Sequence, residues 1–529
     1  MQRDVRGEEA LDVHAHAGAR GEGSRSRGSG RARVRGAGAG RGAPRTSAAR
    51  PVCGLNGART LPEEQSDVLE AAVSDLAVDT PRQPATLRTL LTLAWPVVVS
   101  RASQTIIGLS DTLMVAQLGA AAIAASATGA VNTFTVMILP MGVNFIVQSF
   151  AAQLFGKGDA VGARRYGWYG LMVAVMTELA CLAVWPLVDD VLEVLPYTPE
   201  VRDLMVGYLR IRLLSGGAAI GLEALAEYYG GMGRTRPGMV FNVTAMVLNV
   251  FGNWLFIFGN LGAPALGVSG SALASAIASF VGFTGFFIYF LLDAPKGVRT
   301  RLSLAEFGRM LRFGLPSGFN WLFEFGAYVF FANVVVAGLG TTTLAAMNSV
   351  MSLNSASFMP AMGLASAGAI LVGQAIGAQR KDEVPGVVKL TAKATITWQV
   401  SVGLLCVLFP SVLIAPFARG EGGAEVAEMG AKMLMVSAGW QVFDAIGMTV
   451  AEALRGAGDT FFPMMARIAL AWLVFAPGSY VAVRYLHWGY VGAMVWLVAY
   501  LAMLALVVFL RFRYGAWKHI ALVEGAPAH

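Results

Sequence analysis

Long apolar stretches dominate the chain from about residue 88 to residue 511, and they leave few folds open to it. Each stretch has at least the roughly 20 residues with which a helix crosses a hydrocarbon core of about 30 Å. Lipid offers the backbone no hydrogen-bond partners, so a spanning segment must satisfy its own amides, as a helix does. We therefore predict an all-α polytopic membrane protein with twelve transmembrane helices. The predicted helices cover residues 88–118, 120–154, 165–187, 201–229, 237–259, 266–292, 309–339, 344–376, 386–417, 427–454, 462–485 and 489–511.

The composition agrees with a lipid-embedded chain and argues against several classes of enzyme. Of the 529 residues, 56% are hydrophobic and 14% are charged, and the mean hydropathy is +0.59. The three cysteines are far apart and the five histidines do not cluster, so we expect neither a disulfide framework nor a metal enzyme. The sequence also lacks the GxSxG, HExxH and GxxxxGK[ST] motifs of hydrolases and ATPases. We therefore expect no enzyme and no cofactor, and any transport would be driven by an ion gradient.

Basic residues gather at alternate junctions between the predicted helices. The basic junctions are 156–165, 233–237, 295–301, 379–384 and 454–459, together with the tail from Arg511. The remaining junctions carry fewer basic residues or are acidic, as at 188–200 and 421–428. Basic loops tend to stay on the cytoplasmic side of a membrane, so we expect both termini to be cytoplasmic.

Two stretches of the chain are repeated about 220 residues later, which predicts an internal duplication. Residues 139–159 resemble residues 359–382, and residues 226–237 resemble residues 451–463. Six helices separate the repeats, so both halves enter the membrane with the same orientation and form a parallel repeat with a cavity between two lobes. The predicted parts are an N-lobe at 88–292, a cytoplasmic linker at 293–308, a C-lobe at 309–511 and a cytoplasmic tail at 512–529.

Residues 1–87 have a different composition from the rest of the chain. They are rich in Arg, Gly and Ala and contain no apolar run that could span a membrane or pack, which predicts disorder. A transit peptide and an upstream start-site artefact are the alternatives. This tail contributes much of the formal charge of +7, so the charge is not evidence of a nucleic-acid partner, and we expect none.

Two acidic residues lie deep inside predicted membrane helices. Glu324 shares a helix face with Asn320 and Tyr328, and about 1.5 Å per residue places it roughly 22 Å from the cytoplasmic end. Asp444 lies on a face with Trp440 and Gln441 (Ser437 is on it too), roughly 16 Å from its cytoplasmic end. A charged residue at the bilayer centre costs about 2.5 to 3.5 kcal/mol on insertion scales, so we expect both acids to be functional.

Four stretches of the sequence resemble the MATE family of multidrug and toxic-compound extrusion antiporters, and specifically its NorM-like bacterial branch. They are PVVVSRASQTIIGLSDTLMVAQLG (96–119), NVFGNWLFIFG (249–259), GLPSGFNWLFEFGAYVF (314–330) and GWQVFDAIGMTVAEALRGAGDTFFP (439–463). The resemblance implies export of small hydrophobic organic cations across the inner membrane in exchange for Na⁺ or H⁺. We expect the protein to act as a monomer in the lipid bilayer.

The resemblance also implies roles for particular residues. Glu324 and Asp444 match the family's cation-coupling pair and form a candidate Na⁺ site. Asp111 matches the aspartate of the first helix, with Gln104 two turns earlier on the same face. Trp440 stands where the family usually has tyrosine, which favours an aromatic wall for an organic cation over direct ion contact. Among the further cavity residues, Asn249 and Asn253 match polar positions of the fifth helix.

Several questions remain open at this level. The sequence does not decide between Na⁺ and H⁺, and it leaves Arg101 and Glu178 without a role. Glu227 and Glu452 occupy equivalent repeat positions, and we expect them to cap helix ends or to join the lobes. A flippase for lipid-linked precursors is one alternative function; it would need a cationic cavity, whereas the mid-membrane charges read as mainly acidic. An uncoupled channel or scaffold is the second alternative.

Overall fold

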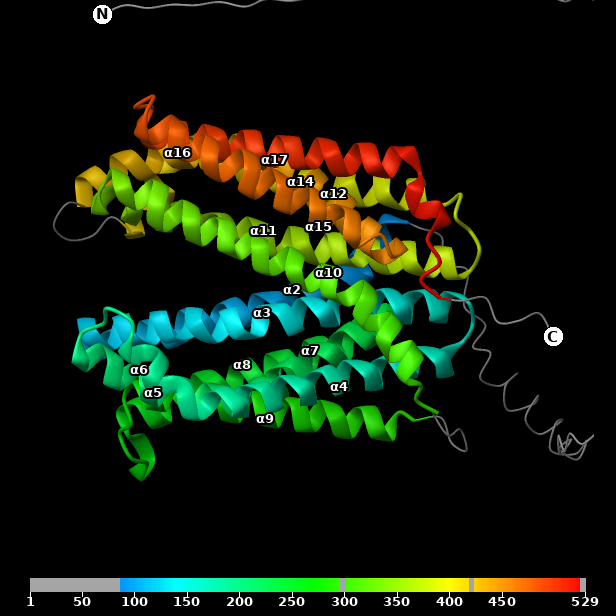
Figure 1. Ribbon diagram of the computed structural model, residues 1–529, viewed down its shortest axis with the longest axis horizontal. Coiled ribbons are helices and arrows are strands. Elements are labelled where there is room, and N and C mark those ends of the chain that lie inside the picture. Colours follow the sequence, from blue (N-terminus) through cyan, green and yellow to red (C-terminus); the bar gives the residue numbers. More distant parts are fainter. Residues whose placement is uncertain (1–85, 295–300, 418–422, 524–529) are drawn as a thin grey trace, which may run out of the picture. The chain divides into compact units, whose positions relative to one another are not determined.

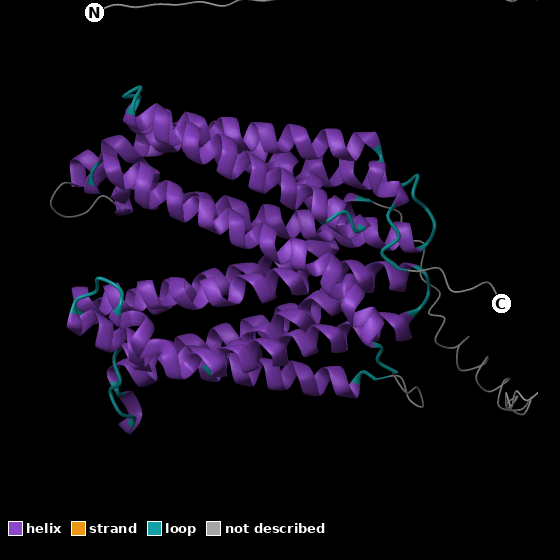
Figure 2. Cartoon of the chain, viewed as in Figure 1, coloured by secondary structure: helices purple, strands orange, loops and turns teal. Residues whose placement is uncertain are grey.

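In a computed structural model, the described residues are 86–294, 301–417 and 423–523, and they fold into helices joined by short turns (Figure 2). The predicted disorder of residues 1–87 falls almost wholly outside this part of the chain. The prediction of an all-α fold is confirmed, since the described segments contain helices and no strands.

The first half of the described chain forms the N-lobe. Thr86 opens it: its side-chain oxygen accepts a hydrogen bond from the amide of Thr89 and so caps the first helix. The helices are α2 (Leu87–Val115), α3 (Ala120–Gly156), α4 (Ala160–Val184), α5 (Val188–Glu193), α6 (Pro199–Leu213), α7 (Gly216–Gly231), α8 (Thr235–Phe258) and α9 (Val268–Leu292).

The second half forms the C-lobe, in which two helices contain π-helical turns. The helices are α10 (Leu304–Phe330), α11 (Thr341–Gly377), α12 (Val384–Leu408), α13 (Pro410–Ile414), α14 (Gly423–Ala457), α15 (Phe461–Ala469), α16 (Ala476–Arg484) and α17 (Gly489–Tyr514). The π segment η4 (Phe331–Val336) continues α10, and η7 (Leu470–Phe475) joins α15 to α16. Figure 1 shows α3 to α9 in one group of helices and α11 to α17 in another.

Within the described segments, eleven helices are long and apolar enough to cross a membrane. The predicted span at 201–229 is instead two shorter helices, α6 and α7, which meet at Leu214 and Ser215. The backbone amides in the first turn of α7 have no partner within the helix. One of them, that of Gly217, donates to the Glu178 carboxylate over 2.6 Å. Glu178, which the sequence left without a role, therefore caps a helix inside the membrane-spanning part.

The lobes meet where α2 and α3 pack against α10 and α11. A Cβ built on Gly142 of α3 would lie 2.6 Å from the Cα of Gly318 on α10, and one on Gly363 of α11 would lie 2.5 Å from Val98 Cγ2 on α2. Because Gly142 and Gly363 occupy the same position in the two repeats, the two approaches are related by the internal duplication. Only glycine permits helix backbones to come this close.

Two boundaries differ from those we predicted. The first C-lobe helix begins at Leu304, inside the predicted linker 293–308. The C-terminal segment packs against the helices: Trp517 is 2% exposed and stacks on Phe512, and Leu522 is fully buried. Over its described length, this segment therefore contributes to the core.

Candidate functional site

A pocket inside the C-lobe contains both predicted coupling acids. Glu324 of α10 and Asp444 of α14 line it together, and the pocket has a volume of about 260 Å³. The aromatic side chains of Tyr328 and Trp440 form part of its wall. An aromatic wall beside two carboxylates is an environment that can bind an organic cation.

Each of the two acids has a polar partner. The Arg467 guanidinium, from α15, forms an ion pair with Glu324 Oε1. Asp444 Oδ2 accepts a hydrogen bond from Gln399 Nε2 of α12 over 2.8 Å. Glu324, Asp444 and Arg467 together line a neighbouring pocket, and the charges of these three side chains sum to −1; the other charged residues of that pocket are paired, Glu452 with Arg455 and Asp459 with Arg511. One monovalent cation would neutralise this group.

Arg467 was missed in the sequence analysis. It lies in the predicted helix 462–485, where an intramembrane basic residue is itself a signal of a functional site. The expectation that mid-membrane charges are mainly acidic is therefore incomplete, because Arg101 and Arg467, both inside predicted membrane helices, have side chains that are only 10% and 14% exposed. Glu324 and Arg467 each lie shortly before a π segment, η4 and η7, where helices commonly carry functional residues.

The remaining C-lobe candidates divide into two kinds. Asn320 faces the pocket, and its buried Oδ1 has no hydrogen-bond partner among the described residues, so this oxygen is free to accept from a ligand or to ligate a cation. Gln441 also lines the pocket, but its Nε2 donates to Asn354 Oδ1 over 2.7 Å and its Oε1 accepts from Ser357 Oγ over 3.1 Å. Those bonds join α14 to α11, so Gln441 fixes the helix that carries Asp444.

Asp111 lies in a separate, hydrogen-bonded group in the N-lobe. Asn253 Nδ2 donates to Asp111 Oδ1 over 2.5 Å, and Ser275 Oγ donates to Asp111 Oδ2 over 3.3 Å. Asn249 Nδ2 in turn donates to Ser275 Oγ over 2.9 Å, and both asparagines are fully buried. Gln104 is exposed and does not belong to this group. Apart from Gln104, the predicted N-lobe residues thus form a site around Asp111, whereas Glu324 and Asp444 form a second one in the other lobe.

Arg101, unassigned from the sequence, pairs with two glutamates of α7. Its guanidinium lies 2.6 Å from Glu223 Oε1 and 2.8 Å from Glu227 Oε1. Glu452, the repeat equivalent of Glu227, pairs with Arg455. Within the described ranges, no three His, Cys, Asp or Glu side chains come together as a metal-ion site.

The fold and these sites define a class of protein: a multi-pass α-helical membrane transporter made of two repeated lobes. The sequence profile of the MatE family matches residues 96–255 and 316–481, one segment in each lobe and together more than half of the chain. The chain belongs to the MatE family.

Curated relatives and solved structures agree with this assignment. A probable multidrug resistance protein NorM from Thermotoga maritima is 27% identical over 447 residues, which cover 83% of this chain and 95% of the relative. A multidrug resistance protein MdtK from Proteus mirabilis is 25% identical over 406 residues, which cover 75% and 88%.

Two solved structures share the fold. One is described as an outward-facing multidrug resistance MATE family transporter of the MOP superfamily; its TM-score is 0.75 at 22% identity, with 82% of this chain and 96% of that chain covered. The other is a MOP superfamily transporter from Pyrococcus furiosus, whose description reports reversed polarity of the binding pocket, with a TM-score of 0.74 at 21% identity over 82% and 96%.

Proposed function

We propose that this protein is a secondary active multidrug efflux antiporter that exchanges hydrophobic organic cations for Na⁺ or H⁺ across the inner membrane. The observation that carries the proposal is the C-lobe pocket, in which Glu324, Asp444 and Arg467 leave one uncompensated negative charge beside Tyr328 and Trp440. A single site with one excess charge binds either an inorganic or an organic monovalent cation. Competition for that charge is the basis of antiport.

Arg467 acts in this scheme as a built-in counter-ion for Glu324. It keeps the pocket from holding two unpaired carboxylates, which would be costly in a medium of low dielectric constant. With Arg467 in place, the group of Glu324, Asp444 and Arg467 needs only one further cation to become neutral. A site with only one excess negative charge therefore binds its cation weakly enough to release it on the other side of the membrane.

The oxygens of the pocket support either coupling ion. A proton needs only one of the two carboxylates, whereas Na⁺ needs several oxygens around it. Asn320 Oδ1, with no protein partner in the described part of the chain, is a further oxygen beside Glu324. Asp111, already held by Asn253 and Ser275, is proposed as the coupling acid of the N-lobe.

Alternating access would follow from movement of one lobe against the other about the interface of α2 and α3 with α10 and α11. The basic turns predict that both termini are cytoplasmic, and we propose that the protein works as a monomer. The ion enters from outside while the organic cation leaves, and the lobes then return with the ion.

The proposal is tested with membrane vesicles and an ethidium-like cation, using a Na⁺ gradient alone and then a pH gradient alone. Efflux driven by one gradient identifies the coupling ion. We expect Glu324→Gln and Asp444→Asn to reduce gradient-driven efflux at least tenfold. Glu428→Gln is the matched control, since Glu428 is an exposed acid that pairs with Lys432 on the same helix as Asp444. Normal rates in both pocket variants would contradict the assignment.

The two alternatives predict different results in the same vesicles. Export of a lipid-linked precursor has some support in the buried guanidinium of Arg467, but it requires a pocket of net positive charge. It would show as competition by anionic amphiphiles and none by organic cations. An uncoupled channel would give fluxes that ionophores do not change.

A further inference from the structure

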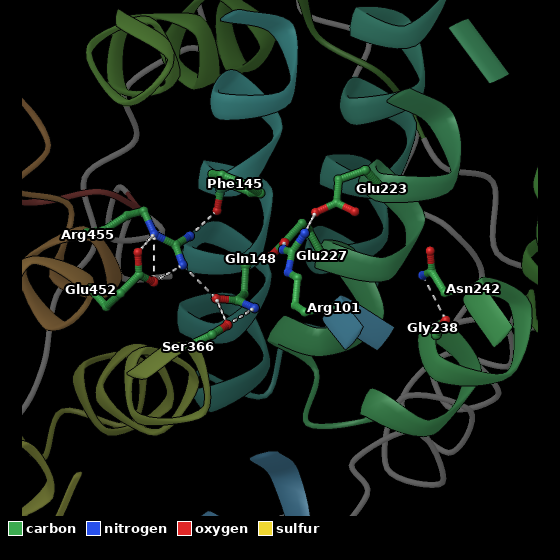
Figure 3. Close-up of polar contacts among 10 residues, drawn as sticks. All are labelled: Arg101, Phe145, Gln148, Glu223, Glu227, Gly238, Asn242, Ser366, Glu452 and Arg455. Carbon is green, nitrogen blue, oxygen red and sulfur yellow. Dashed lines mark hydrogen bonds and ion pairs between the residues drawn. The ribbon is translucent and has the colours of Figure 1, made fainter. Parts of the chain in front are cut away.

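A second cluster of buried charges lies at the contact between the lobes, and its C-lobe members, Glu452 and Arg455, also line the pocket surface that carries Glu324 and Asp444. Arg101 of α2 points between the carboxylates of Glu223 and Glu227 of α7, at 2.6 Å and 2.8 Å (Figure 3). On the other side of α3, Arg455 of α14 pairs with Glu452 (Figure 3). The two guanidinium carbons lie 5.3 Å and 5.8 Å from the same Phe145 ring, so this ring of α3 separates two cations of opposite lobes.

The cluster connects the two lobes directly. Arg455 donates to the carbonyl of Phe145 and, over 3.0 Å, to Gln148 Oε1, both on α3. Gln148 Nε2 then donates to Ser366 Oγ of α11 over 3.1 Å. Besides its pair with Glu452 on its own helix, the C-lobe arginine therefore has polar partners on an N-lobe helix, and separating the lobes would remove those partners.

Two further hydrogen bonds beside this cluster are related to each other by the internal repeat. Gln153 Nε2 donates to the Gly456 carbonyl over 2.9 Å, and Gln374 Nε2 donates to the Gly231 carbonyl over 3.1 Å. Each bond crosses between the lobes. We call these two bonds and the contacts of Arg455 with α3 the turn-side interface, because they lie next to the basic turns.

The charges of the cluster do not balance. Glu223, Glu227 and Glu452 carry three negative charges against the two positive charges of Arg101 and Arg455. Glu227 is 4% exposed, and its Oε2 has no hydrogen-bond partner in the part of the chain that the structure describes. A cavity of about 30 Å³, enough for one water-sized occupant, lies among Arg101, Glu223 and Glu227.

The neighbouring elements supply no other compensating charge. Glu227 interacts electrostatically with Glu223, Arg101, Arg455 and Glu452. The arginines nearest to α7 are engaged elsewhere: Arg164 of α4 donates to the Phe290 carbonyl, and Arg234, in the turn before α8, pairs with Asp293. Gln148 of α3 and Ser366 of α11 are neutral. Among the described residues, one buried negative charge of this cluster therefore has no counter-ion.

We propose that the triad of Arg101, Glu223 and Glu227 is a binding site for one monovalent cation, a proton or Na⁺, whose occupancy holds the turn-side interface closed. Leaving a buried carboxylate unpaired costs several kcal/mol, and a bound cation removes that cost. When the lobes separate, the Arg455–Glu452 ion pair withdraws as a neutral unit and water reaches the carboxylates of the triad, so the ionised form is stabilised by hydration. The cation thus binds more tightly to the closed interface and stabilises it by linkage.

The sign of the pH effect follows from this difference. Since the closed interface binds the proton more tightly, lowering the pH fills the site and increases the closed fraction. Raising the pH empties the site and favours the open form. For a single proton, the ratio of closed to open molecules changes at most about tenfold per pH unit.

The test measures the distance between the lobes rather than transport, so it stands apart from the test of drug efflux. Spin labels are placed at Arg236→Cys, at the exposed start of α8, and at Asp382→Cys, in the exposed turn before α12 of the other lobe, after the three native cysteines are replaced by alanine. Pulsed electron paramagnetic resonance in lipid nanodiscs then gives the distance distribution as pH is raised without Na⁺. A second series adds Na⁺ at alkaline pH.

Glu223→Gln and Glu227→Gln each remove the excess charge and imitate a permanently filled site, so either variant alone is a sufficient test. We expect the short distance to persist across the pH range in both. Glu178→Gln is the control, since it makes the same change of charge in the same lobe but caps the opposite end of α7. It should follow the wild-type curve.

The two series also identify the ligand. Return of the short distance in the wild type on adding Na⁺ at alkaline pH, with no effect of Na⁺ on Glu227→Gln, would show that the site takes Na⁺. Return only on acidification would show that it takes a proton. The proposal would be overturned if the wild-type distances changed neither with pH nor with Na⁺. It would also be overturned if the Glu223→Gln and Glu227→Gln proteins opened at the same pH midpoint as the wild type.

Discussion

Single residues decide the electrostatics of this protein, and Arg467 is the clearest case. It lies against Glu324 and shares a pocket with Asp444, so it sets the local charge at −1 instead of −2. A carboxylate pair without it would attract cations more strongly and release them more slowly. Arg467 therefore lowers the affinity of the pocket for cations to a value at which a bound cation can dissociate.

Replacing Arg467 by glutamine should therefore tighten binding and slow transport. We expect the affinity for a monovalent organic cation to rise roughly tenfold, equivalent to about 1.4 kcal/mol, while gradient-driven efflux falls. Equilibrium binding of a fluorescent cation to protein in nanodiscs measures the first effect, and vesicle efflux the second. Arg484→Gln, an exposed arginine in the same predicted span, is the control. Weaker binding in Arg467→Gln would show that the guanidinium contacts the substrate rather than opposing it.

At the scale of helices, glycine sets how closely the lobes approach. A Cβ built on Gly377 of α11 would lie 1.9 Å from the carbonyl oxygen of Gln153, and one on Gly156 of α3 would lie 2.2 Å from that of Gln374. The two positions are equivalents in the repeat, and each contacts the partner lobe. The C-terminal ends of α3 and α11 must contact each other's backbone. Only then do the side chains of Gln153 and Gln374 reach the carbonyls of Gly456 and Gly231.

Gly377→Ala should therefore force the ends of α3 and α11 apart. We expect the labels at Arg236→Cys and Asp382→Cys to show a larger open fraction, and efflux to fall several-fold, because the closed interface can no longer form fully. Gly386→Ala provides the control, since a Cβ there meets nothing within 4 Å. An unchanged distance distribution in Gly377→Ala would mean that the backbone relaxes without opening the lobes.

At the scale of the whole molecule, the duplication creates a nearly symmetric contact between the lobes. Gln153 bonds to Gly456, and Gln374 bonds to Gly231. The charges beside them are not symmetric: Arg234 pairs with Asp293 in the N-lobe, while in the C-lobe Asp459 pairs with Arg511. The repeat thus preserves the positions of contacts while it exchanges the sign of the charges.

Removing the two glutamine side chains tests whether these bonds hold the lobes together. One hydrogen bond contributes about 1 kcal/mol, so Gln153→Ala and Gln374→Ala should each raise the ratio of open to closed molecules about fivefold. The double variant should raise it by more than either single change, as measured with the same spin labels. Thr244→Ala, which removes a hydrogen bond within α8 only, is the control. If the single variants had the same ratio of open to closed molecules as this control, other contacts would hold the interface closed.

Much of the architecture could be predicted from the sequence. Apolar runs of spanning length must be helical in lipid because their amides have no other partners, and the repeats at 139–159 and 359–382 predicted the two lobes. Four-residue spacing likewise placed Asn320, Glu324 and Tyr328 on one face, and that face lines the pocket. These predictions depend only on helix length and on residue spacing along a helix, and both can be obtained directly from the sequence.

Only the tertiary structure decided which charges meet. Arg101 and Glu227 are 126 residues apart, and no local pattern relates them. Arg467 pairs with Glu324 because α15 packs against α10 with those two faces together, which depends on the rotation and tilt of each helix. The break between α6 and α7 was likewise hidden, because an apolar run does not show where a carboxylate such as Glu178 can cap a new helix. Sequence thus determined the helices and their polar faces, while packing determined the partner of each buried charge, because Coulomb energy depends on distances that only the assembled fold sets.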